Sequence, residues 1–576
     1  MKARSTGNPP VGEHGGHVDV GSLPFMFRSS MLLLAGLLSV AIALCRATPH
    51  ATQPDALPRI SQRQTPTLER VFVDSFNRQR IFHGTNAVVK GPPWIPDVTE
   101  FSQDISLTDE DFQLMKRLGL SVVRLGVMWA GVEPVQRGHY NETYLDVVED
   151  IVTRGAKYGI YFLLDMHQDS MHEFFCGEGL PTWAVKSDGL KNYFGKFPEP
   201  LAKPYVEKDA NNFPVRSDCN RYKWAVYYAT ESQSSAWQAL WENIDGIADA
   251  WGDMLAHVAL RFKNVSSVLG IEMINEPYAG DIYHYPGIAI PLKPYSADYK
   301  NMQSAYDLVS KKINEADENR LIFFAGLPWD DFGSGFDHAP SHNPAKSVLA
   351  YHYYCCGDGP QFPNSSKFQI EVQRNVARKL NTGTMMTETF APDQFDQFYL
   401  KNGVADNCDR FLQSWATWEW KTFCRESNES VHGKSQWAEY GSCKTGYGVP
   451  WNVTTNRPFK AKYLARTHAR AVSGNITSMK FDAQTGKFEL RYELDLTIKM
   501  PSEIFMSTEY YYHRESNISS GTNSNPFLSP APIIQIHPEA CVRADFDEND
   551  NMLYVSASNE ESCAHMHGVE VTINIT

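Results

Sequence analysis

The sequence predicts an α/β protein, a (β/α)8 TIM barrel followed by a C-terminal antiparallel β-sandwich domain. Three observations support this prediction. Short apolar runs alternate with helix-like stretches over residues 67–474, polar side chains end these runs, and residues 475–576 change to a two-residue alternation. A chain of 576 residues is too long for one ordinary compact domain, but it accommodates a barrel with a second domain.

The composition favours a large buried core and argues against a nucleic-acid partner. Hydrophobic residues make up 42% of the chain and charged residues 21%, which is typical of a globular protein. The 53 Lys and Arg are outnumbered by 67 Asp and Glu, so the net charge is −14. Because binding of nucleic-acid phosphates needs a basic face, we expect no nucleic-acid partner.

An uncharged apolar run, residues 31–45, lies between Arg28 and Arg46. A spanning helix needs about 20 apolar residues, whereas a run of this length matches the core of a signal peptide. We therefore expect a signal peptide with a long polar front over residues 1–47, and an uncleaved anchor is the alternative. Residues 48–66 are rich in Pro, Thr, Gln and Arg, and we expect them to form a flexible lead-in.

Acceptor triplets for N-glycosylation recur along the chain. They begin at Asn141, Asn264, Asn364, Asn428, Asn452, Asn475, Asn517 and Asn574. These triplets fit passage through the secretory pathway, and the ten cysteines agree with an oxidising compartment. We predict a secreted glycoprotein with disulfide bonds, and a lysosomal or signal-anchored form is the alternative. The pairing of the cysteines does not follow from their spacing.

The barrel prediction depends on eight apolar runs in order. They are residues 81–88, 122–127, 160–164, 268–274, 321–325, 348–353, 384–387 and 413–418. Amphipathic stretches at 109–118, 144–158, 236–262 and 297–316 lie between several of them and predict the intervening helices. The seventh run is short, and counting it as a strand depends in part on a family resemblance.

The C-terminal residues follow a different period. Apolar residues alternate with polar ones over 488–496 and again over 569–575, with no helical stretch between. Alternation with a period of two places one face of a strand in the core. Residues 475–576 are therefore predicted to form a small β-sandwich packed on the barrel.

Functional side chains of a (β/α)8 barrel lie where strands end, because the following loops converge on one mouth. The predicted strand ends are richer in polar and charged residues than packing requires. They carry Asn86, Arg124, Asp165, His167, Asp169, Asn275, Glu276, His352, Tyr354, Glu388 and Trp418. A lone histidine at a strand end is more often a satisfied structural residue, but so many polar residues on one rim indicate a site.

Two carboxylates are what hydrolysis of a glycosidic bond requires. One protonates the leaving oxygen, and the other stabilises or attacks the anomeric carbon. Glu276 after the fourth strand and Glu388 at the seventh would face each other across the mouth. We expect the separation of about 5–5.5 Å found in retaining enzymes, rather than about 6.5–9.5 Å for inverting ones.

Several motifs carry a family resemblance. The Asn-Glu-Pro triplet at 275–277, the His-x-Tyr at 352–354 and Glu388 before a Trp-rich strand resemble the retaining glycosidases of the clan that contains family 5 cellulases. Within this clan, FHGTNAVVKGPPWIP (82–96), SVVRLGVMWAGVEP (121–134), LLDMHQDSMHEFFCGEGLPTWAV (163–185) and IEMINEPYAGD (271–281) resemble endoglycoceramidases. The resemblance covers the barrel, and the family's C-terminal β-sandwich matches the alternating tail.

The resemblance implies a role for each matching residue. Glu276 would be the general acid/base, and Glu388 would be the nucleophile that forms a glycosyl-enzyme. Arg124 would keep Glu388 ionised, and Tyr354 would hydrogen-bond to it. Asn275 would bind the hydroxyl next to the reacting carbon.

Further residues are implied to bind the sugar. They are His167, His352 and Asp169, which would orient it, Lys90, which would contact its hydroxyls, and Trp418, on which its ring would stack. Lys90 fits an ordinary solvated lysine equally well. Tyr353 competes with Tyr354 for the inward position, because a shift of one residue exchanges the faces of a strand.

Trp415 and Trp420 compete with Trp418 in the same way.

Two long excursions leave the predicted barrel. Residues 170–235 are rich in aromatic side chains, and residues 282–295 carry Ile288, Ile290 and Leu292 in a Pro-rich loop. We hypothesise that they form the walls of an aromatic sugar cleft and of an apolar slot for ceramide. The alternative is a satellite core that covers the rim. The aromatic residues are Phe174, Phe175, Trp183, Tyr193, Phe194, Phe197, Tyr205, Trp224, Tyr227 and Tyr228.

The sequence thus predicts a retaining endo-glycosidase that hydrolyses the β-glycosidic bond between oligosaccharide and ceramide of glycosphingolipids, at a membrane or micelle surface. No cofactor is expected, because hydrolysis by two carboxylates needs none. No metal is expected either, because the adjacent Cys355 and Cys356 lack zinc-site spacing and the lone His565-x-His567 fits a surface position better than a ligand pair. An activator protein or a detergent-like lipid is a candidate partner. The alternatives are a β-glucosylceramidase, a steryl-glucoside hydrolase or another family 5 β-glycosidase, and a non-catalytic glycolipid-binding protein.

Overall fold

The structure is a computed structural model that describes most of the chain after residue 56. The described residues are 57–102, 105–185, 210, 213–214, 216–219, 222, 224–290, 293–328, 333–354, 365–390, 403–421, 423, 458–512, 532–558 and 561–576. The expected signal segment lies outside them, as do the triplets at Asn364, Asn428, Asn452 and Asn517. Among the described residues, no helix is both long enough and apolar enough to cross a bilayer.

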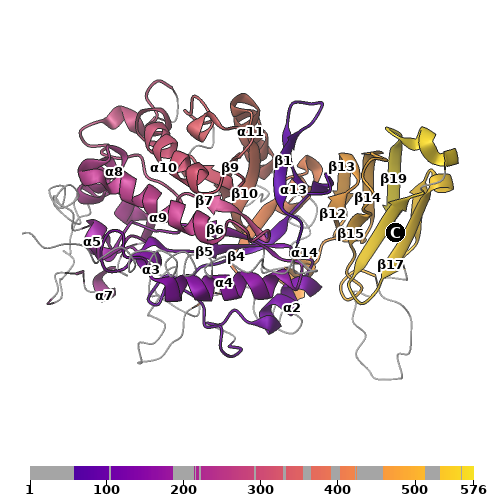
Figure 1. The fold of residues 1–576 in the computed structure, drawn as a ribbon, viewed down its shortest axis with the longest axis horizontal. Helices are drawn as coiled ribbons and strands as arrows, with labels where there is room; N and C mark the ends of the chain where they lie inside the picture. Colours follow the sequence, from indigo (N-terminus) through magenta and orange to yellow (C-terminus); the bar gives the residue numbers. More distant parts are fainter. Residues whose placement is uncertain are drawn as a thin grey trace, which may run out of the picture. The chain divides into compact units, whose positions relative to one another are not determined.

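Eight parallel strands close into a barrel, as the sequence predicts (Figure 1). In chain order they are β4 (His83–Ala87), β5 (Val122–Gly126), β6 (Tyr161–Asp165), β7 (Val268–Glu272), β8 (Leu321–Ala325), β9 (Ser347–Tyr353), β10 (Gly383–Phe390) and β11 (Trp415–Trp418). The short seventh run proves to be a full strand, β10, and β11 pairs with β4 to close the barrel.

Strands β6, β7 and β8 are buried along their whole length, since helices cover them outside and their own side chains fill the inside. Phe82, Tyr161, Leu163, Leu269 and Phe323 belong to one buried cluster of the barrel. Figure 1 shows helices α4, α9 and α10 around the strands.

The helices follow the strands with loops of different lengths. They are α2 (Asp109–Arg117), α3 (Trp129–Val132), α4 (Glu142–Ala156), α5 (Thr182–Val185), α7 (Arg216–Cys219), α8 (Glu231–Trp241), α9 (Ile247–Arg261), α10 (Gln303–Ala316), α11 (Ser365–Leu380), α13 (Val404–Phe411) and α14 (Pro458–Leu464). The stretch 236–262, expected as one segment, is divided between α8 and α9. Asn243, Asp245 and Gly246 have φ of 54°, 55° and 72°, and this left-handed backbone cannot continue a helix.

Two antiparallel sheets complete the fold, and most of their strands follow the barrel in the chain, drawn in orange to yellow in Figure 1. The four-stranded sheet has the order β13-β14-β19-β16, and the seven-stranded sheet has the order β1-β2-β3-β12-β15-β18-β17. Their bounds are β13 (Gly474–Phe481), β14 (Phe488–Leu494), β16 (Ile534–His537), β19 (Glu570–Ile575), β1 (Ile60–Gln64), β2 (Arg70–Asp74), β3 (Gln79–Arg80), β12 (His468–Val472), β15 (Ser502–Phe505), β17 (Val542–Asp547) and β18 (Met552–Ala557).

The predicted alternation is present in the C-terminal strands. Leu490 and Tyr492 of β14 pair with Ile573 and Val571 of β19, and all four side chains are buried. The opposite face of these strands carries the polar residues, as expected for a sheet with one face in the core.

The N-terminal lead-in differs from the prediction. Residues 60–64, expected to be flexible, form β1, and β2 and β3 belong to the C-terminal sheet rather than to the barrel. The connection is made by Arg80 of β3 pairing with Ala471 of β12. β1 itself pairs with β2, and its sequence ISQRQ has little strand propensity, so composition around residue 60 could not reveal the strand. Ile60 and Phe72 also pack into the barrel's buried cluster.

A pair of buried histidines lies between the barrel and the seven-stranded sheet. The rings of His83 (β4) and His468 (β12) stack with centroids 3.6 Å apart. Burial is the main cause that lowers the pKa of both imidazoles, that of His468 to about 3. For His83, the neighbouring His468 and then nearby arginines lower the pKa further. Both are therefore neutral in the folded protein, whereas in the unfolded chain they take up protons below their ordinary value of 6.5.

We expect this pair to make the protein less stable in acid. A histidine with a lowered folded-state pKa costs stability as pH falls below its unfolded value, by about 1.4 kcal/mol per pH unit. Replacing His468 with Gln should remove one such contribution. Between pH 7 and pH 5, the unmodified protein should lose about 2 kcal/mol more unfolding free energy than H468Q, as measured by urea denaturation. H139Q, at an exposed position, should lose as much unfolding free energy as the unmodified protein. An equally large loss in H468Q would contradict the prediction.

Candidate active site

The polar residues predicted at the strand ends come together at one mouth of the barrel. Arg124 lies in β5, Asp165 ends β6, Glu272 ends β7, His352 lies near the end of β9 and Glu388 lies in β10. In parallel strands of one barrel these ends point the same way, which is why residues far apart in sequence meet here.

Glu276 and Glu388 face each other across His352. Nδ1 of His352 lies 2.7 Å from Oε1 of Glu276 and 3.5 Å from Oε2 of Glu388. One carboxylate oxygen from each glutamate and one ring nitrogen of His352 all lie within 4.8 Å of one another. The two carboxylates can therefore contact the same bound molecule at one place, each from its own side.

The backbone that presents Glu276 is in an unusual conformation. Its φ is +35°, in the left-handed region that non-glycine residues rarely adopt. Gln168 holds this segment, because its Nε2 donates to the carbonyl oxygens of Asn275 at 2.6 Å and of Glu276 at 3.2 Å. These two hydrogen bonds, from the loop that follows β6, hold the strained backbone of Glu276 in place.

Arg124 lies fully buried behind the two glutamates. Its guanidinium donates to Glu388 Oε1 at 2.7 Å and makes a two-point contact with Glu272, at 2.6 and 3.1 Å. It also donates to Asn275 Oδ1 at 2.9 Å and lies 3.1 Å from Asp165 Oδ2. Its guanidinium also donates to Asn86 Oδ1 at 3.0 Å, so one arginine fixes the positions of three carboxylates and two amides.

Opposing effects set the charge states in this cluster. Burial acts to lower the pKa of Arg124, but the carboxylates of Asp165, Glu272 and Glu388 outweigh it and raise the pKa. Burial raises the pKa of Glu272, and Arg124 only partly offsets this effect. Burial acts to lower the pKa of His352, yet Glu388 and Glu276 raise it overall. The site therefore holds its charges by pairing them within a water-poor environment.

The structure resolves which tyrosine faces the site. The hydroxyl of Tyr354 donates to Glu388 Oε2 at 2.8 Å, and its side chain is 43% exposed at the mouth. Tyr353 points the other way, is buried, and hydrogen-bonds Ser365 of α11. Glu388 thus has one oxygen held by Arg124 and the other by Tyr354.

The structure also separates the three tryptophans. Trp418 lies against two predicted site residues, with Lys90 Nζ 4.6 Å from its ring centroid and the His167 ring stacked at 5.5 Å. Trp415 instead packs against His83, away from this mouth. Trp420 is fully buried, and its Nε1 donates to Asp111 of α2 at 2.9 Å.

Lys90, His167 and Asp169 form a second charged group beside Trp418. Lys90 makes an ion pair with Asp169, and Nε2 of His167 lies 3.4 Å from Asp169 Oδ2. Although burial opposes it, the charges of Lys90 and His167 lower the pKa of Asp169. Lys90 is 6% exposed, so it is a buried, paired lysine and not a solvated one.

Comparison with known proteins decides the family. The family model described as "Cellulase (glycosyl hydrolase family 5)" matches residues 83–405. The model of the glycoside hydrolase family 5 C-terminal domain matches residues 466–571. An endoglycoceramidase of Cyanea nozakii is 38% identical over 464 residues, which are 79% of this chain and 85% of the relative. An endoglycoceramidase of Hydra vulgaris is 38% identical over 427 residues, 73% of this chain and 76% of the relative.

The chain belongs to glycosyl hydrolase family 5. The solved structure of endo-glycoceramidase II from Rhodococcus sp. in complex with ganglioside GM3 has the same fold, with a TM-score of 0.62. It is 19% identical, and the match covers 88% of this chain and 98% of that one. The protein is thus a glycoside hydrolase with the barrel and C-terminal domain of its family.

Two residues of this family 5 site were missed by the sequence reasoning. Glu272 ends β7 within a run taken as apolar, and Gln168 lies in the segment LLDMHQD without having been assigned a role. The signal for Glu272 was available, because a charged residue in a strand buried on both faces needs a partner of opposite charge in a neighbouring strand. Arg124 is the residue that meets this need.

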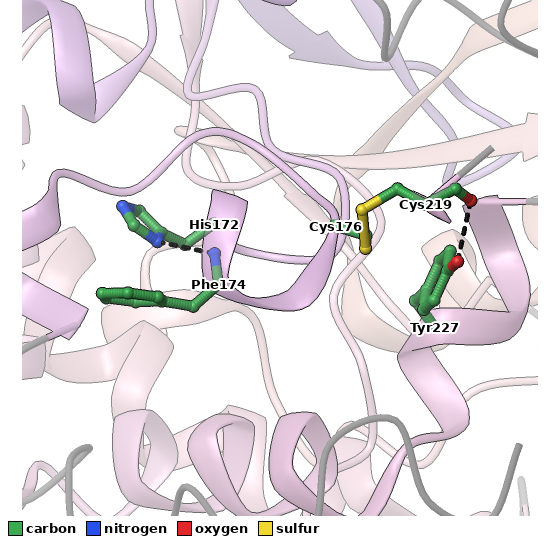
Figure 2. Close-up of a disulfide and its surroundings, with 5 residues drawn as sticks. All are labelled: His172, Phe174, Cys176, Cys219 and Tyr227. Carbon is green, nitrogen blue, oxygen red and sulfur yellow. Dashed lines mark hydrogen bonds between the residues drawn. A yellow bond between two sulfur atoms is a disulfide. The ribbon is translucent and has the colours of Figure 1, made fainter. Parts of the chain in front are cut away.

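The aromatic excursion after β6 is held by a disulfide (Figure 2). Cys176 and Cys219 are bonded, and the Tyr227 hydroxyl donates to the Cys219 carbonyl at 2.7 Å. Nearby, the backbone N–H of Phe174 donates to Nδ1 of His172. Tyr193, Phe194, Phe197 and Tyr205 lie outside the described residues. The excursion contains the short helices α5 and α7, although its sequence shows no helical pattern.

The excursion after β7 exposes apolar side chains. Ile288 is buried, whereas Ile290 is 46% exposed, and Leu292 lies outside the described residues. A hollow of about 480 Å³ is lined by Ile288, Tyr285, Tyr295 and neighbouring polar residues. This loop continues the segment that follows β7 and carries Glu276.

Proposed function

We propose that this protein is a retaining endoglycoceramidase, which hydrolyses the β-glycosidic bond between the oligosaccharide and the ceramide of glycosphingolipids. The observation that carries the proposal is the meeting of Glu276 and Glu388 within 4.8 Å at one barrel mouth. The endoglycoceramidases that are 38% identical over most of the chain support the substrate class.

In the first step, Glu388 attacks the anomeric carbon and Glu276 donates its proton to the leaving ceramide oxygen. The bond to ceramide breaks as the bond to Glu388 forms, which gives a glycosyl-enzyme. Arg124 and Tyr354 hold the two oxygens of Glu388 in a fixed orientation. Such positioning replaces the reorganisation of solvent that the same attack would require in water.

In the second step, Glu276 accepts a proton from a water molecule, which attacks the anomeric carbon and releases Glu388. His352 lies between the two glutamates, and its Nδ1 contacts Glu276. Its hydrogen bond can therefore adjust when Glu276 gains or loses a proton. Two displacements on the same carbon restore the β configuration of the released sugar.

The remaining predicted residues are proposed to bind the sugar. Asn275 donates one N–H to the Gln168 carbonyl, which leaves its second N–H for a sugar hydroxyl. Trp418 offers an aromatic face, and the paired Lys90, His167 and Asp169 offer donors and acceptors beside it. Aromatic faces with polar groups around them are suited to sugar rings, which have both apolar faces and hydroxyl edges.

The proposal is tested with a defined ganglioside in detergent micelles. We expect equal amounts of intact oligosaccharide and ceramide by mass spectrometry, and the β-anomer as the first sugar product by NMR. A β-glucosylceramidase would instead release glucose from glucosylceramide and leave the ganglioside intact. A non-catalytic binding protein would retain the ganglioside without releasing either product.

The lipid side of the substrate is proposed to lie along the loop after β7. Replacing Ile290 with Asp should weaken turnover of the ganglioside by about tenfold, because covering one apolar side chain contributes about 1.5–3 kcal/mol. Hydrolysis of a water-soluble aryl lactoside should be unchanged. Leu260→Asp, at a 59% exposed position on α9, is the matched control and should affect neither reaction. Unchanged ganglioside turnover in I290D would favour the satellite-core alternative.

The protein is also proposed to be secreted as a glycoprotein, with activity aided by an activator protein or a detergent-like lipid. Asn141 and Asn264 are exposed, and two disulfides, Cys176–Cys219 and Cys541–Cys563, fit an oxidising compartment. Expression through a eukaryotic secretory pathway should give medium-borne protein that loses mass on treatment with an N-glycanase. Retention of the protein inside the cells with unmodified asparagines would contradict this.

A further inference from the structure

Asp307, His338 and His342 form a cluster of metal-ligating side chains, which we call the histidine–aspartate cluster. Asp307 lies in α10, and both histidines lie in the connection between β8 and β9. One ligating atom from each residue lies within 4.8 Å of the other two. None of the three residues takes part in the glycosidase site.

The carboxylate of the cluster is held in a fixed orientation. Oδ1 of Asp307 accepts from the backbone N–H of Ser341 at 2.7 Å, and Oδ2 lies 2.9 Å from Nε2 of His338. The Ser341 hydroxyl also donates to the carbonyl of Asp307 at 3.1 Å. A ligand carboxylate that is itself hydrogen-bonded is typical of protein metal sites.

The two imidazoles lie face to face beside this carboxylate. Their ring centroids are 3.6 Å apart and their planes differ by 9°. The turn that places His342 over His338 is costly, because Ser341 and His342 both have left-handed backbones, with φ of 53° and 52°. The nitrogen lone pairs of stacked imidazoles lie in parallel planes, so binding of one ion by both rings requires the exposed His342 ring to turn about its side-chain bonds.

We propose that the histidine–aspartate cluster binds one Zn²⁺ ion. Two imidazole nitrogens, one carboxylate oxygen and the four-residue step from His338 to His342 match the ligands and spacing of zinc sites. His342 is exposed, so water can take the fourth position of a tetrahedron. Ca²⁺ and Mg²⁺ are disfavoured because they prefer oxygen ligands throughout.

The ion would tie the β8–β9 connection to α10. Pro328 and Ser334 of this connection line a small hollow together with Glu276 and His352. A zinc ion in the cluster would therefore stabilise one wall of the mouth without taking part in hydrolysis.

The test compares the unmodified protein with H338Q/H342Q after removal of metals by a chelator. Zn²⁺ is added, and the bound equivalents are measured by competition with a chromophoric chelator. We expect the unmodified protein to bind one equivalent more than the double variant, and its Tm to rise by several degrees with Zn²⁺ while that of the variant does not. Zinc bound at Glu276, His352 and Glu388 would add the same number of equivalents to both proteins and would inhibit hydrolysis. These two results distinguish it from zinc bound at the histidine–aspartate cluster.

H565Q/H567Q, which removes two histidines of the C-terminal domain instead, should bind as many equivalents as the unmodified protein. Equal Tm values of all three proteins in the chelator would show that the variants are folded. If H338Q/H342Q binds as much Zn²⁺ as the unmodified protein, or if neither binds any, the proposal is overturned. If H342Q alone retains the full equivalent, His342 is not a ligand and the proposal also fails.

Discussion

Replacing Glu388 with Gln is expected to lower kcat on a ganglioside by at least about 10,000-fold, because the variant cannot form the glycosyl-enzyme. Gln is nearly isosteric and can keep a contact with Arg124, so the fold should persist. Glu276→Gln should lower kcat by about 100- to 10,000-fold, since it removes proton transfer but leaves the nucleophile.

The two variants are separated with an aryl lactoside whose leaving group needs no proton. With E276Q, the first step should be fast and the second slow, so a lactosyl group should accumulate on Glu388 and be seen by mass spectrometry of the intact protein. With E388Q, no adduct should form. Glu315→Gln, at an exposed position in α10, is the control for general effects. An adduct on E388Q, or unchanged hydrolysis by it, would remove Glu388 from its proposed role.

Arg124→Lys is expected to lower kcat by about 100-fold or more while conserving the charge. A lysine cannot make the two-point contact with Glu272 and at the same time reach Glu388 and Asn275. Misplacement of a reacting group by about 1 Å costs on the order of 100-fold in rate. Because the carboxylates around it are buried, the variant should also unfold at a lower temperature.

A matched control distinguishes this site from arginine replacement in general. Arg261 of α9 also contacts three carboxylates, those of Glu142, Asp146 and Glu149, but its side chain is 26% exposed. Arg261→Lys should change the unfolding free energy by no more than about 0.5 kcal/mol and leave kcat unchanged. A kcat of R124K equal to that of R261K would contradict the positioning role of Arg124.

The barrel was largely predictable because buried parallel strands have a strong local signal. The runs at 160–164 and 321–325 are apolar throughout, the run at 268–274 is apolar apart from Glu272, and β6, β7 and β8 form there. Strand β10 was the weakest, since its sequence GTMMTETF includes Thr387 and Glu388, which contact Glu272 and Arg124 of the site. A strand that carries functional residues loses part of its apolar pattern for that reason.

The lead-in was predicted wrongly because pairing within a sheet, and not local propensity, makes it a strand. Strand β1 has the sequence ISQRQ, which has little strand propensity of its own. It is a strand because it pairs with β2 in the sheet that β3 joins to β12. The break between α8 and α9 was missed for a related reason, since Asn243 and Asp245 tolerate both helical and left-handed backbones.

The sequence by itself determined the barrel, the alternating C-terminal strands and the residue types at the mouth, because these follow from local periodicity and from where strands end. Only the tertiary structure decided that Tyr354 and Trp418 face the site while Tyr353, Trp415 and Trp420 do not. It also revealed that Glu272 shares Arg124 with Glu388. The direction of a side chain near a strand end depends on twist and register, and the pairing of buried charges depends on neighbouring strands, neither of which is encoded within a short window of sequence.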